Sequence, residues 1–284
     1  MIILNGKTLA STIKDTVKRE VTRKFSVNSF GLAVIKVGND PASATYVKNK
    51  QKACEYCGIN FELFELPEEI SEGNLLNLIR TLNNCDSIAG ILVQLPLPKH
   101  IDEHAVIQTI APEKDVDGFH EINVGKHLIG EYTFIPCTTK GIVTLLKANN
   151  IEIEGKHCVV VGRSNIVGKP TAIELLHNNG TVTICHSKTE NLKKICKSAD
   201  ILICAIGKPK FFTKDYVKSG AVVIDVGIHR QEDGSLCGDV DFDNVADIVS
   251  AITPVPGGVG AMTVAMLVSN CLQAAFDQKS SNHS

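Results

Sequence analysis

Tyr46 and Lys50 have the residue types and the spacing for proton transfer. They lie four residues apart in a stretch with helical periodicity, so both side chains project from one helix face. A lysine buried beside a tyrosine has a lowered pKa, because burial disfavours the charged form, and can act as an acid or a base. Lys48 and Lys52 share the segment, and composition does not tell the three lysines apart. Only Lys50 has the four-residue spacing to Tyr46. The alternative is that Lys50 is an ordinary exposed helix lysine.

A second pattern favours phosphate binding. The apolar run 157–161 leads into Gly162, Arg163 and Ser164, and helical periodicity resumes at Lys169. Such a strand–glycine turn–helix unit directs backbone N–H groups and a helix N-terminus toward an anion. The spacing is neither G-x-G-x-x-G, because Ser164 replaces the second glycine, nor that of a Walker loop. An ordinary strand-to-helix turn is the alternative interpretation.

The next expected strand, 181–185, indicates which cofactor is bound. NAD sites usually have an acidic residue about 20 residues after the glycine turn, where it binds the ribose 2′-hydroxyl. Here the strand is followed by His186, Ser187 and Lys188, with no acid. Arg163 and the Ser187 hydroxyl suit a 2′-phosphate, so the sequence favours NADP over NAD. Lys188 is either a further contact or a solvated side chain.

Three further segments contain residues suited to binding a substrate or a cofactor. Gln94 follows an apolar strand, the usual place for ligand-binding residues in α/β sheets. Asp117 precedes Gly118 in an acidic loop, where it is either a ligand carboxylate or a turn-forming residue. The segment 253–260 combines two prolines with three glycines, which suits either a loop along a cofactor or a stiff turn.

Taken together, five motifs in order resemble the bifunctional methylenetetrahydrofolate dehydrogenase/methenyltetrahydrofolate cyclohydrolase family. They are residues 46–53, 90–98, 114–118, 161–164 and 252–260. The resemblance covers nearly the whole chain. It implies oxidation of 5,10-methylenetetrahydrofolate by NADP, followed by hydrolysis of the methenyl product to 10-formyltetrahydrofolate. It also implies a homodimer.

The resemblance also assigns roles to residues. Lys50 matches the catalytic lysine, with Tyr46 beside it, and Gln94 would hydrogen-bond the lysine and help set its protonation. Asp117, rather than Asp115, would anchor the pterin. The remaining assignments follow the family's motifs: the substrate would also meet Gly257 and Gly258, and the cofactor would meet Gly162, Arg163, Ser164, Ser187 and Ile228.

The sequence departs from the family pattern at three positions. Thr139 and Ala261 stand where proline is usual, and His229 stands where asparagine is usual. The first two relax backbone stiffness without removing a reactive group. His229 follows Ile228 and is therefore expected to affect the nicotinamide side of the cofactor site.

The elements that must position these residues alternate between strand and helix. We expect an α/β protein of two α/β domains, the second a doubly wound, parallel-sheet, Rossmann-type domain, with a cleft between them. Residues 1–138 would form the folate-binding, catalytic domain, joined by the C-terminal helix 262–284, and residues 139–261 the NADP-binding domain. Residues 111–130 are expected to be a loop with at most one helical turn. Further helices are expected at 213–218 and 262–276.

The composition limits the kinds of partner and the location that we expect for this protein. The 29 basic and 31 acidic residues give a net charge of −2, which argues against nucleic acid as the main partner. The apolar run at the start is too short for a signal peptide, and no stretch is expected to reach the length of a membrane helix. We therefore expect a cytoplasmic protein, and the ten cysteines are read as reduced thiols. No ligand pattern indicates a metal site.

Two other functions would use the same fold. An NADP-dependent dehydrogenase for another small substrate would need Arg163 and Ser187 but would give no role to Tyr46, Lys50, Gln94 and Asp117. A folate- or nucleotide-binding regulator without activity would not need Lys50 or Asp117, and both are present.

Overall fold

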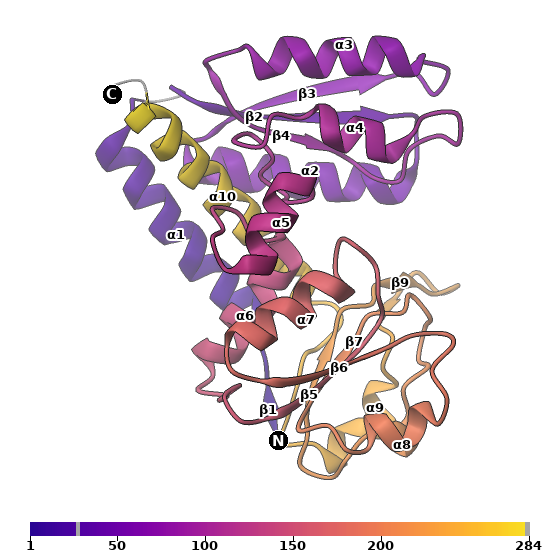
Figure 1. Ribbon diagram of the computed structural model, residues 1–284. Helices are drawn as coiled ribbons and strands as arrows, with labels where there is room; N and C mark the ends of the chain where they lie inside the picture. Colours follow the sequence, from indigo (N-terminus) through magenta and orange to yellow (C-terminus); the bar gives the residue numbers. More distant parts are fainter. Residues whose placement is uncertain (27–28, 282–284) are drawn as a thin grey trace. The chain divides into compact units, whose positions relative to one another are not determined.

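The computed structural model describes residues 1–26 and 29–281. Its contacts divide the chain into two compact units (Figure 1). The first, here called the three-stranded unit, consists of Ser11–Cys137 and the chain from Val264 on. The second, the six-stranded unit, consists of Met1–Ala10 and Thr138–Thr263. The first ten residues thus belong with the later part of the chain, whereas the sequence pattern predicts that they belong with residues 11–138.

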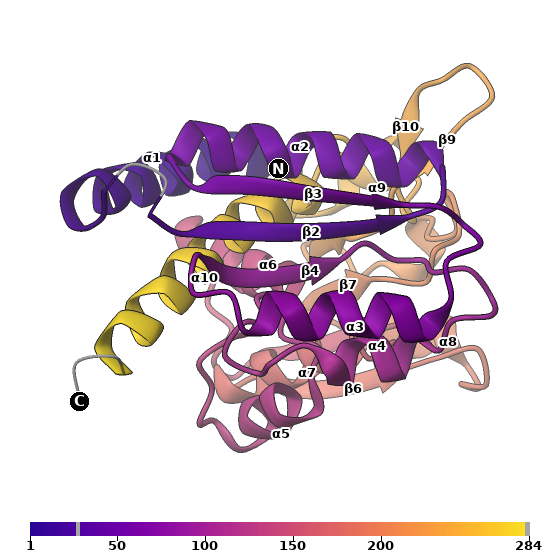
Figure 2. The ribbon, with the colours of Figure 1, turned by 90° about the horizontal axis from the view of Figure 1, so that it is seen from above.

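The three-stranded unit is built on a parallel sheet in the order β3-β2-β4. Figure 2 shows the three strands side by side and pointing the same way. The strands are β2 (Gly31–Val37), β3 (Asn60–Leu66) and β4 (Ile88–Val93). The helices are α1 (Gly6–Lys24), α2 (Pro41–Cys57), α3 (Glu72–Asn83), α4 (Glu103–Thr109), α5 (Glu121–Ile129) and α10 (Val259–Ser281), of which α1 and α10 also run into the other unit.

Both faces of this sheet are covered, which explains why its central strand is apolar except for Lys36, whose amine pairs with Glu65 at 2.7 Å. Every residue of β2 is buried. Ala33 and Ile35 of β2 pack with side chains of α3 and α4, and α2 covers the opposite face (Figure 1). Such burial on both faces is typical of parallel sheets. The sheet therefore holds α2 and the end of β4 in fixed positions.

Helix α2 has clear sequence signals at both ends. Asp40 caps its start, because the side chain accepts a hydrogen bond of 2.7 Å from the Ser43 amide. Gly58 ends it in the left-handed conformation, with φ of 77°. The helix expected around Tyr46 and Lys50 is therefore confirmed. Its length carries Tyr46 and Lys50 on consecutive turns.

The six-stranded unit contains a sheet in the order β1-β11-β8-β7-β5-β6, in which all neighbours are parallel. Its strands are β1 (Ile2–Ile3), β5 (His157–Val161), β6 (Thr181–Cys185), β7 (Ile201–Cys204), β8 (Val222–Asp225) and β11 (Ala251–Ile252). A separate hairpin is formed by β9 (His229–Arg230) and β10 (Leu236–Cys237). The helices are α6 (Cys137–Ala148), which also begins in the other unit, α7 (Gly168–His177), α8 (Leu192–Cys196) and α9 (Phe242–Val245).

Two separate apolar cores flank this sheet. One packs α6 and α7 against side chains such as Val160 and Ile203. The other packs α8, α9 and the loop around Phe212 against Val159 and Val161. Alternate residues of the same strand thus serve opposite faces, as a doubly wound sheet requires. The predicted α/β fold class with a Rossmann-type second domain is confirmed.

Several sequence predictions of local structure were wrong. Residues 111–130 contain a nine-residue helix, α5, which the His120 ring caps at its start and Gly130 ends. The expected helix 213–218 is only a 3-10 turn, Lys214–Tyr216. Strand β1 was not predicted at all, because its two residues form a strand only by pairing with β11. Tertiary contacts, rather than periodicity, decide such short elements.

The last helix also corrects an expectation. Helix α10 runs over 23 residues rather than 262–276. By length and composition, its stretch Val259–Ser280 could cross a membrane, which the sequence analysis did not expect. However, 61% of its most apolar window is buried within the protein, and the core helix of a soluble protein passes the same test.

Candidate active site

Lys50 and Gln94 meet in the three-stranded unit. Lys50 projects from α2, and Gln94 follows the last residue of β4. The Gln94 amide N–H still joins the sheet, donating to the Ile35 carbonyl at 2.8 Å, so the residue is held at the strand's carboxyl end. The Lys50 Nζ donates to the Gln94 Oε1 at 2.8 Å. The Gln94 Nε2 in turn donates to the Leu95 carbonyl at 2.8 Å, which fixes the amide's orientation.

Asp117 is a second charged residue that interacts electrostatically with Lys50. Burial lowers the pKa of Lys50, and Asp117 is the largest of the charges that oppose this shift. Burial likewise raises the pKa of Asp117, and Lys50 opposes that shift. The affinities of the two groups for a proton are therefore closer together than in water. An ammonium–carboxylate pair in this environment can exchange a proton with a bound molecule.

The loop that carries Asp117 is held by residues whose positioning role was not predicted from the sequence. Buried Asp115 accepts hydrogen bonds from the His120 amide and the Asn123 Nδ2, at 2.8 and 2.9 Å. Asn270, buried in α10, donates to the Val116 carbonyl at 2.9 Å. A polar asparagine within the apolar α10 sequence was the available signal. These bonds leave Asp117 little freedom to move away from Lys50.

Tyr46 lies one helical turn before Lys50 on α2. It is 37% exposed, and partial burial raises the pKa of its phenol. The phenol is therefore neutral at pH 7 and can donate a hydrogen bond.

The glycine turn in the six-stranded unit forms a close-packed cradle. Gly162 has φ of 135°, and a Cβ placed there would lie 2.2 Å from the Ala205 carbonyl oxygen. A Cβ at Gly168 would lie 2.3 Å from the Gly162 oxygen. Only glycine fits either position. The Ser164 Oγ accepts hydrogen bonds from the Val167 and Gly168 amides, at 3.2 and 3.3 Å, and so shapes the start of α7.

Arg163 and Ser187 lie beyond the ends of two paired strands. Val161 of β5 is in register with Cys185 of β6, so the residues that follow both strands leave the same sheet edge. Arg163 and Ser187 are both exposed. Among the residues that the structure describes, Arg163 makes no ion pair. A free cation and a hydroxyl at this edge fit a 2′-phosphate.

Ile228 and the proline–glycine loop leave the same edge further along the sheet. Ile228 follows β8 and is 39% exposed. Gly257, after β11, accepts a hydrogen bond of 2.9 Å from the Lys7 amide. Gly258 has no room for a side chain, because a Cβ there would lie 2.6 Å from the Pro254 oxygen. The predicted cofactor residues, together with both loop glycines, thus belong to the six-stranded unit, and Tyr46, Lys50, Gln94 and Asp117 to the other.

Comparison with known proteins identifies the family. The model of the tetrahydrofolate dehydrogenase/cyclohydrolase catalytic domain matches residues 4–117, and that of the family's NAD(P)-binding domain matches residues 136–279. The chain belongs to the tetrahydrofolate dehydrogenase/cyclohydrolase family. The resemblance drawn from its five motifs is confirmed.

Individual relatives match over almost their full length. The bifunctional protein FolD of Lachnoclostridium phytofermentans is 62% identical over 275 residues, covering 96% of this chain and 98% of that protein. The solved FolD dehydrogenase/cyclohydrolase of Campylobacter jejuni is 49% identical, with a TM-score of 0.94 and coverage of 98% and 99%. The Trypanosoma brucei FolD, solved with NADP and an inhibitor, is 37% identical, with a TM-score of 0.93 and coverage of 100% and 99%.

Two of the three departures from the family pattern have a structural explanation. The Thr139 hydroxyl is buried and lies 3.0 Å from that of Thr171, so each satisfies the other. The His229 Nε2 lies 2.8 Å from an oxygen of Asp239. Ala261 lies in the first turn of α10, and nothing in the structure explains its difference from proline.

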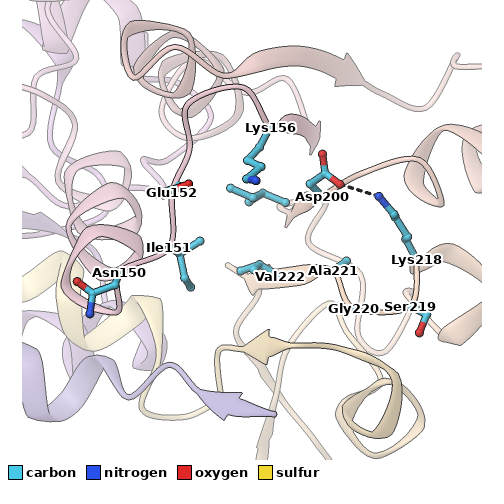
Figure 3. A pocket seen from close by; sticks show the side chains of 11 residues that line it. Asn150, Ile151, Glu152, Lys156, Asp200, Lys218, Ser219, Gly220, Ala221 and Val222 are labelled. Carbon is cyan, nitrogen blue, oxygen red and sulfur yellow. Dashed lines mark hydrogen bonds and ion pairs between the residues drawn. The ribbon is translucent and has the colours of Figure 1, made fainter.

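A pocket of about 490 Å³ lies at the opposite edge of the six-stranded sheet (Figure 3). Lys156, Asp200 and Ala221, which line it, directly precede β5, β7 and β8. Asp200 forms an ion pair of 2.6 Å with Lys218 across its wall. Ligands of open α/β sheets bind at the carboxyl ends of strands instead. None of the predicted site residues lines this pocket.

Proposed function

We propose that Lys50, Gln94 and Asp117 carry out the folate chemistry of this family. The chain oxidises 5,10-methylenetetrahydrofolate to 5,10-methenyltetrahydrofolate with NADP and hydrolyses the product to 10-formyltetrahydrofolate. The observation that carries the residue assignment is the partly buried Lys50 amine, 2.8 Å from the Gln94 amide oxygen and under the influence of the Asp117 carboxylate.

Hydrolysis requires two proton transfers, and Lys50 is placed to make both. Its lowered pKa makes the neutral amine accessible, and this amine takes a proton from the water that attacks the methenyl carbon. The resulting ammonium returns a proton to folate N5 as the bond between N5 and that carbon breaks. Besides these two transfers, the carbinol hydroxyl formed by the attack loses its proton to solvent as its oxygen becomes the formyl carbonyl, and this is the one proton that the reaction releases overall. Gln94 orients the lysine by accepting its N–H, and Tyr46 supplies a neutral hydroxyl on the same helix face.

Asp117 is the proposed anchor of the pterin ring. A carboxylate accepts two parallel N–H bonds from the amino group and a ring nitrogen of a pterin. Its loop is fixed by Asp115 and Asn270, so the ring would be held in one orientation. The same carboxylate stabilises the Lys50 ammonium between the two proton transfers. We further propose that Gly257 and Gly258 contact the substrate through their main chain.

The six-stranded unit is the proposed site of NADP. The glycine cradle at Gly162 and the exposed Arg163 fit a dinucleotide with a 2′-phosphate. Bound there, NADP would supply the hydride acceptor for oxidation of the folate methylene carbon. Ser164 uses its oxygen to accept two loop amides and retains one O–H to donate. Ser187 would contact the 2′-phosphate, and the main chain at Ile228 the nicotinamide.

Substitution of Lys50 by methionine tests the assignment. We expect Lys50→Met to abolish hydrolysis of methenyltetrahydrofolate while the folate still binds, as measured by product formation and by calorimetry. The matched control is Lys48→Met, an exposed lysine on the same helix, which should retain activity. Unchanged hydrolysis in Lys50→Met would remove this residue from the mechanism.

We also propose that the protein is a homodimer. Helix α5 exposes an unusual number of apolar side chains, with Leu128 and Ile129 exposed by 59% and 66%. Ile129→Glu should lower the molar mass measured by light scattering from two chains to one. Lys126→Glu, an exposed position on the same helix, should leave it unchanged. A wild-type mass of one chain would refute the dimer.

The thiols support the proposed cytoplasmic location. None of the ten cysteines, all of which lie in the described residues, forms a disulfide, and nine of them are buried. Free thiols persist in a reducing compartment. The near-neutral charge of the chain favours small-molecule partners over nucleic acid.

A further inference from the structure

Two buried carboxylates lie at the edge of the six-stranded sheet where the cofactor loops begin. Asp225 is the last residue of β8, and Asp239 follows the hairpin of β9 and β10. They are 3% and 0% exposed. Neither makes an ion pair with a lysine or arginine in the described chain. A buried carboxylate in such surroundings must be satisfied by hydrogen-bond donors.

Asp239 has four donors, and three come from one loop. The amides of Ile206, Gly207 and Lys208, directly after β7, donate to its two oxygens at 2.6, 3.0 and 2.9 Å. The fourth is the His229 Nε2 at 2.8 Å, which we assign as a donor because both oxygens of Asp239 already accept amide N–H groups. Asp239 thereby joins the loop after β7 to the segment after Ile228.

Asp225 extends the same network to two more segments. It accepts hydrogen bonds from the amides of Gly227, Asp239 and Val240, at 3.0, 2.9 and 2.9 Å. Its own amide donates to the Thr253 Oγ1 at 2.7 Å. Thr253 begins the proline–glycine loop. The loops after β7, β8 and β11 are therefore tied together through two carboxylates and one hydroxyl.

The network also sets the shape of the glycine cradle. The Ala205 carbonyl, one residue before the three amides that Asp239 binds, is the group that Gly162 approaches so closely. Gly227 is packed equally tightly, since a Cβ there would lie 2.3 Å from an Asp239 oxygen. A shift of the loop after β7 would therefore displace the backbone at Gly162. A shift of Gly227 would likewise displace its neighbour Ile228.

We propose that Asp239 is a positioning residue of the cofactor site, which holds the loops after β7 and β8 in the arrangement that receives NADP. This inference rests on the cofactor site proposed above. Asp239 does not touch the reacting atoms. It acts through the backbone amides of residues 206–208 and through His229, which occupies a position where the family usually has asparagine.

Substitution by asparagine isolates this role. Asp239→Asn keeps the size of the side chain but replaces one acceptor oxygen by an NH₂ group, which faces N–H donors. We expect the KM for NADP to rise about tenfold, the change that follows from losing one charge-assisted hydrogen bond or more. Hydrolysis of supplied methenyltetrahydrofolate needs no NADP, so it should stay within twofold of the wild type.

Controls separate positioning from loss of folded protein. Unfolding of a fraction of the molecules would lower the turnover of both activities together and leave the KM for NADP unchanged. Asp243→Asn, an exposed position in α9, makes the same chemical change outside the network and should behave as wild type. If Asp239→Asn does not fold, His229→Phe removes one donor and keeps the three amides. It should raise the KM for NADP by a smaller factor.

The outcomes distinguish this inference from the proposed function. An unchanged KM for NADP in folded Asp239→Asn, or in His229→Phe when Asp239→Asn fails to fold, would overturn the positioning role. Absence of NADP reduction by the wild type would instead refute the cofactor site itself. A rise in KM confined to Asp239→Asn and His229→Phe, with hydrolysis retained, is the result that supports the inference.

Discussion

The hydrogen bond between Lys50 and Gln94 predicts in which direction the pH dependence of hydrolysis should shift when Gln94 is replaced. The Lys50 Nζ donates at 2.8 Å to a neutral amide oxygen, an arrangement that favours the protonated amine. A hydrogen bond to a charged group contributes roughly 1.5–3 kcal/mol. The neutral amine would donate a weaker bond of roughly 0.5–1.5 kcal/mol. Removing the acceptor should therefore lower the pKa of Lys50, and the difference of about 1–1.5 kcal/mol between the two forms corresponds to up to about a tenfold change in its acid dissociation constant.

Two variants of similar size should move the profile in opposite directions. Gln94→Leu removes the acceptor, so the limb of the rate profile that reports Lys50 should move to lower pH. Gln94→Glu places a carboxylate beside the amine, which favours the charged form and should move the limb to higher pH. Both variants lose the hydrogen bond from Nε2 to the Leu95 carbonyl. The loss of this bond therefore does not contribute to the difference between their two pH profiles.

The assay is the initial rate of methenyltetrahydrofolate hydrolysis from pH 5 to 10, corrected for the uncatalysed reaction at each pH. Turnover at saturating folate reports the pKa in the enzyme–substrate complex. Shifts of the same sign in both variants, or no shift in either, would refute the assignment of this limb to a Lys50 that is tuned by Gln94.

Three further predictions concern the cofactor unit. Arg163→Ala should weaken NADP by about tenfold or more and NAD far less, as measured by fluorescence titration, because only NADP has the 2′-phosphate; an equal loss for both would contradict the assignment. Gly162→Ala should destabilise the protein by more than about 2 kcal/mol in urea unfolding, because its methyl group would lie 2.2 Å from the Ala205 oxygen; unchanged stability would show that the turn can relax. Burial raises the pKa of Asp225 to about 6, so its contribution to stability is lost as pH rises from about 4 to about 6. The free energy of unfolding of the wild type, relative to Asp225→Asn, should therefore fall by about 3 kcal/mol between pH 4 and pH 7, and a constant difference would contradict that shift.

The sequence by itself determined the long elements and the family. Helix α2 was predictable because its periodicity, its capping Asp40 and its terminal Gly58 are all local signals. The parallel sheets were predictable because their central strands are buried on both faces and are therefore largely apolar. The motifs around Lys50, Gln94, Asp117 and Gly162 were enough to indicate the reaction and the cofactor.

Only the tertiary structure decided which polar groups meet. Strand β1 exists because β11 lies beside it, and α5 is a nine-residue helix with Gly125 at its centre, a residue that lowers the local preference for helix. The pairing of Lys50 with Gln94 joins residues 44 positions apart, and that of Asp239 with residues 206–208 joins residues more than 30 apart. Hydrogen bonds over such separations leave no periodic trace in the sequence, because each is fixed by the packing of whole elements rather than by local preference.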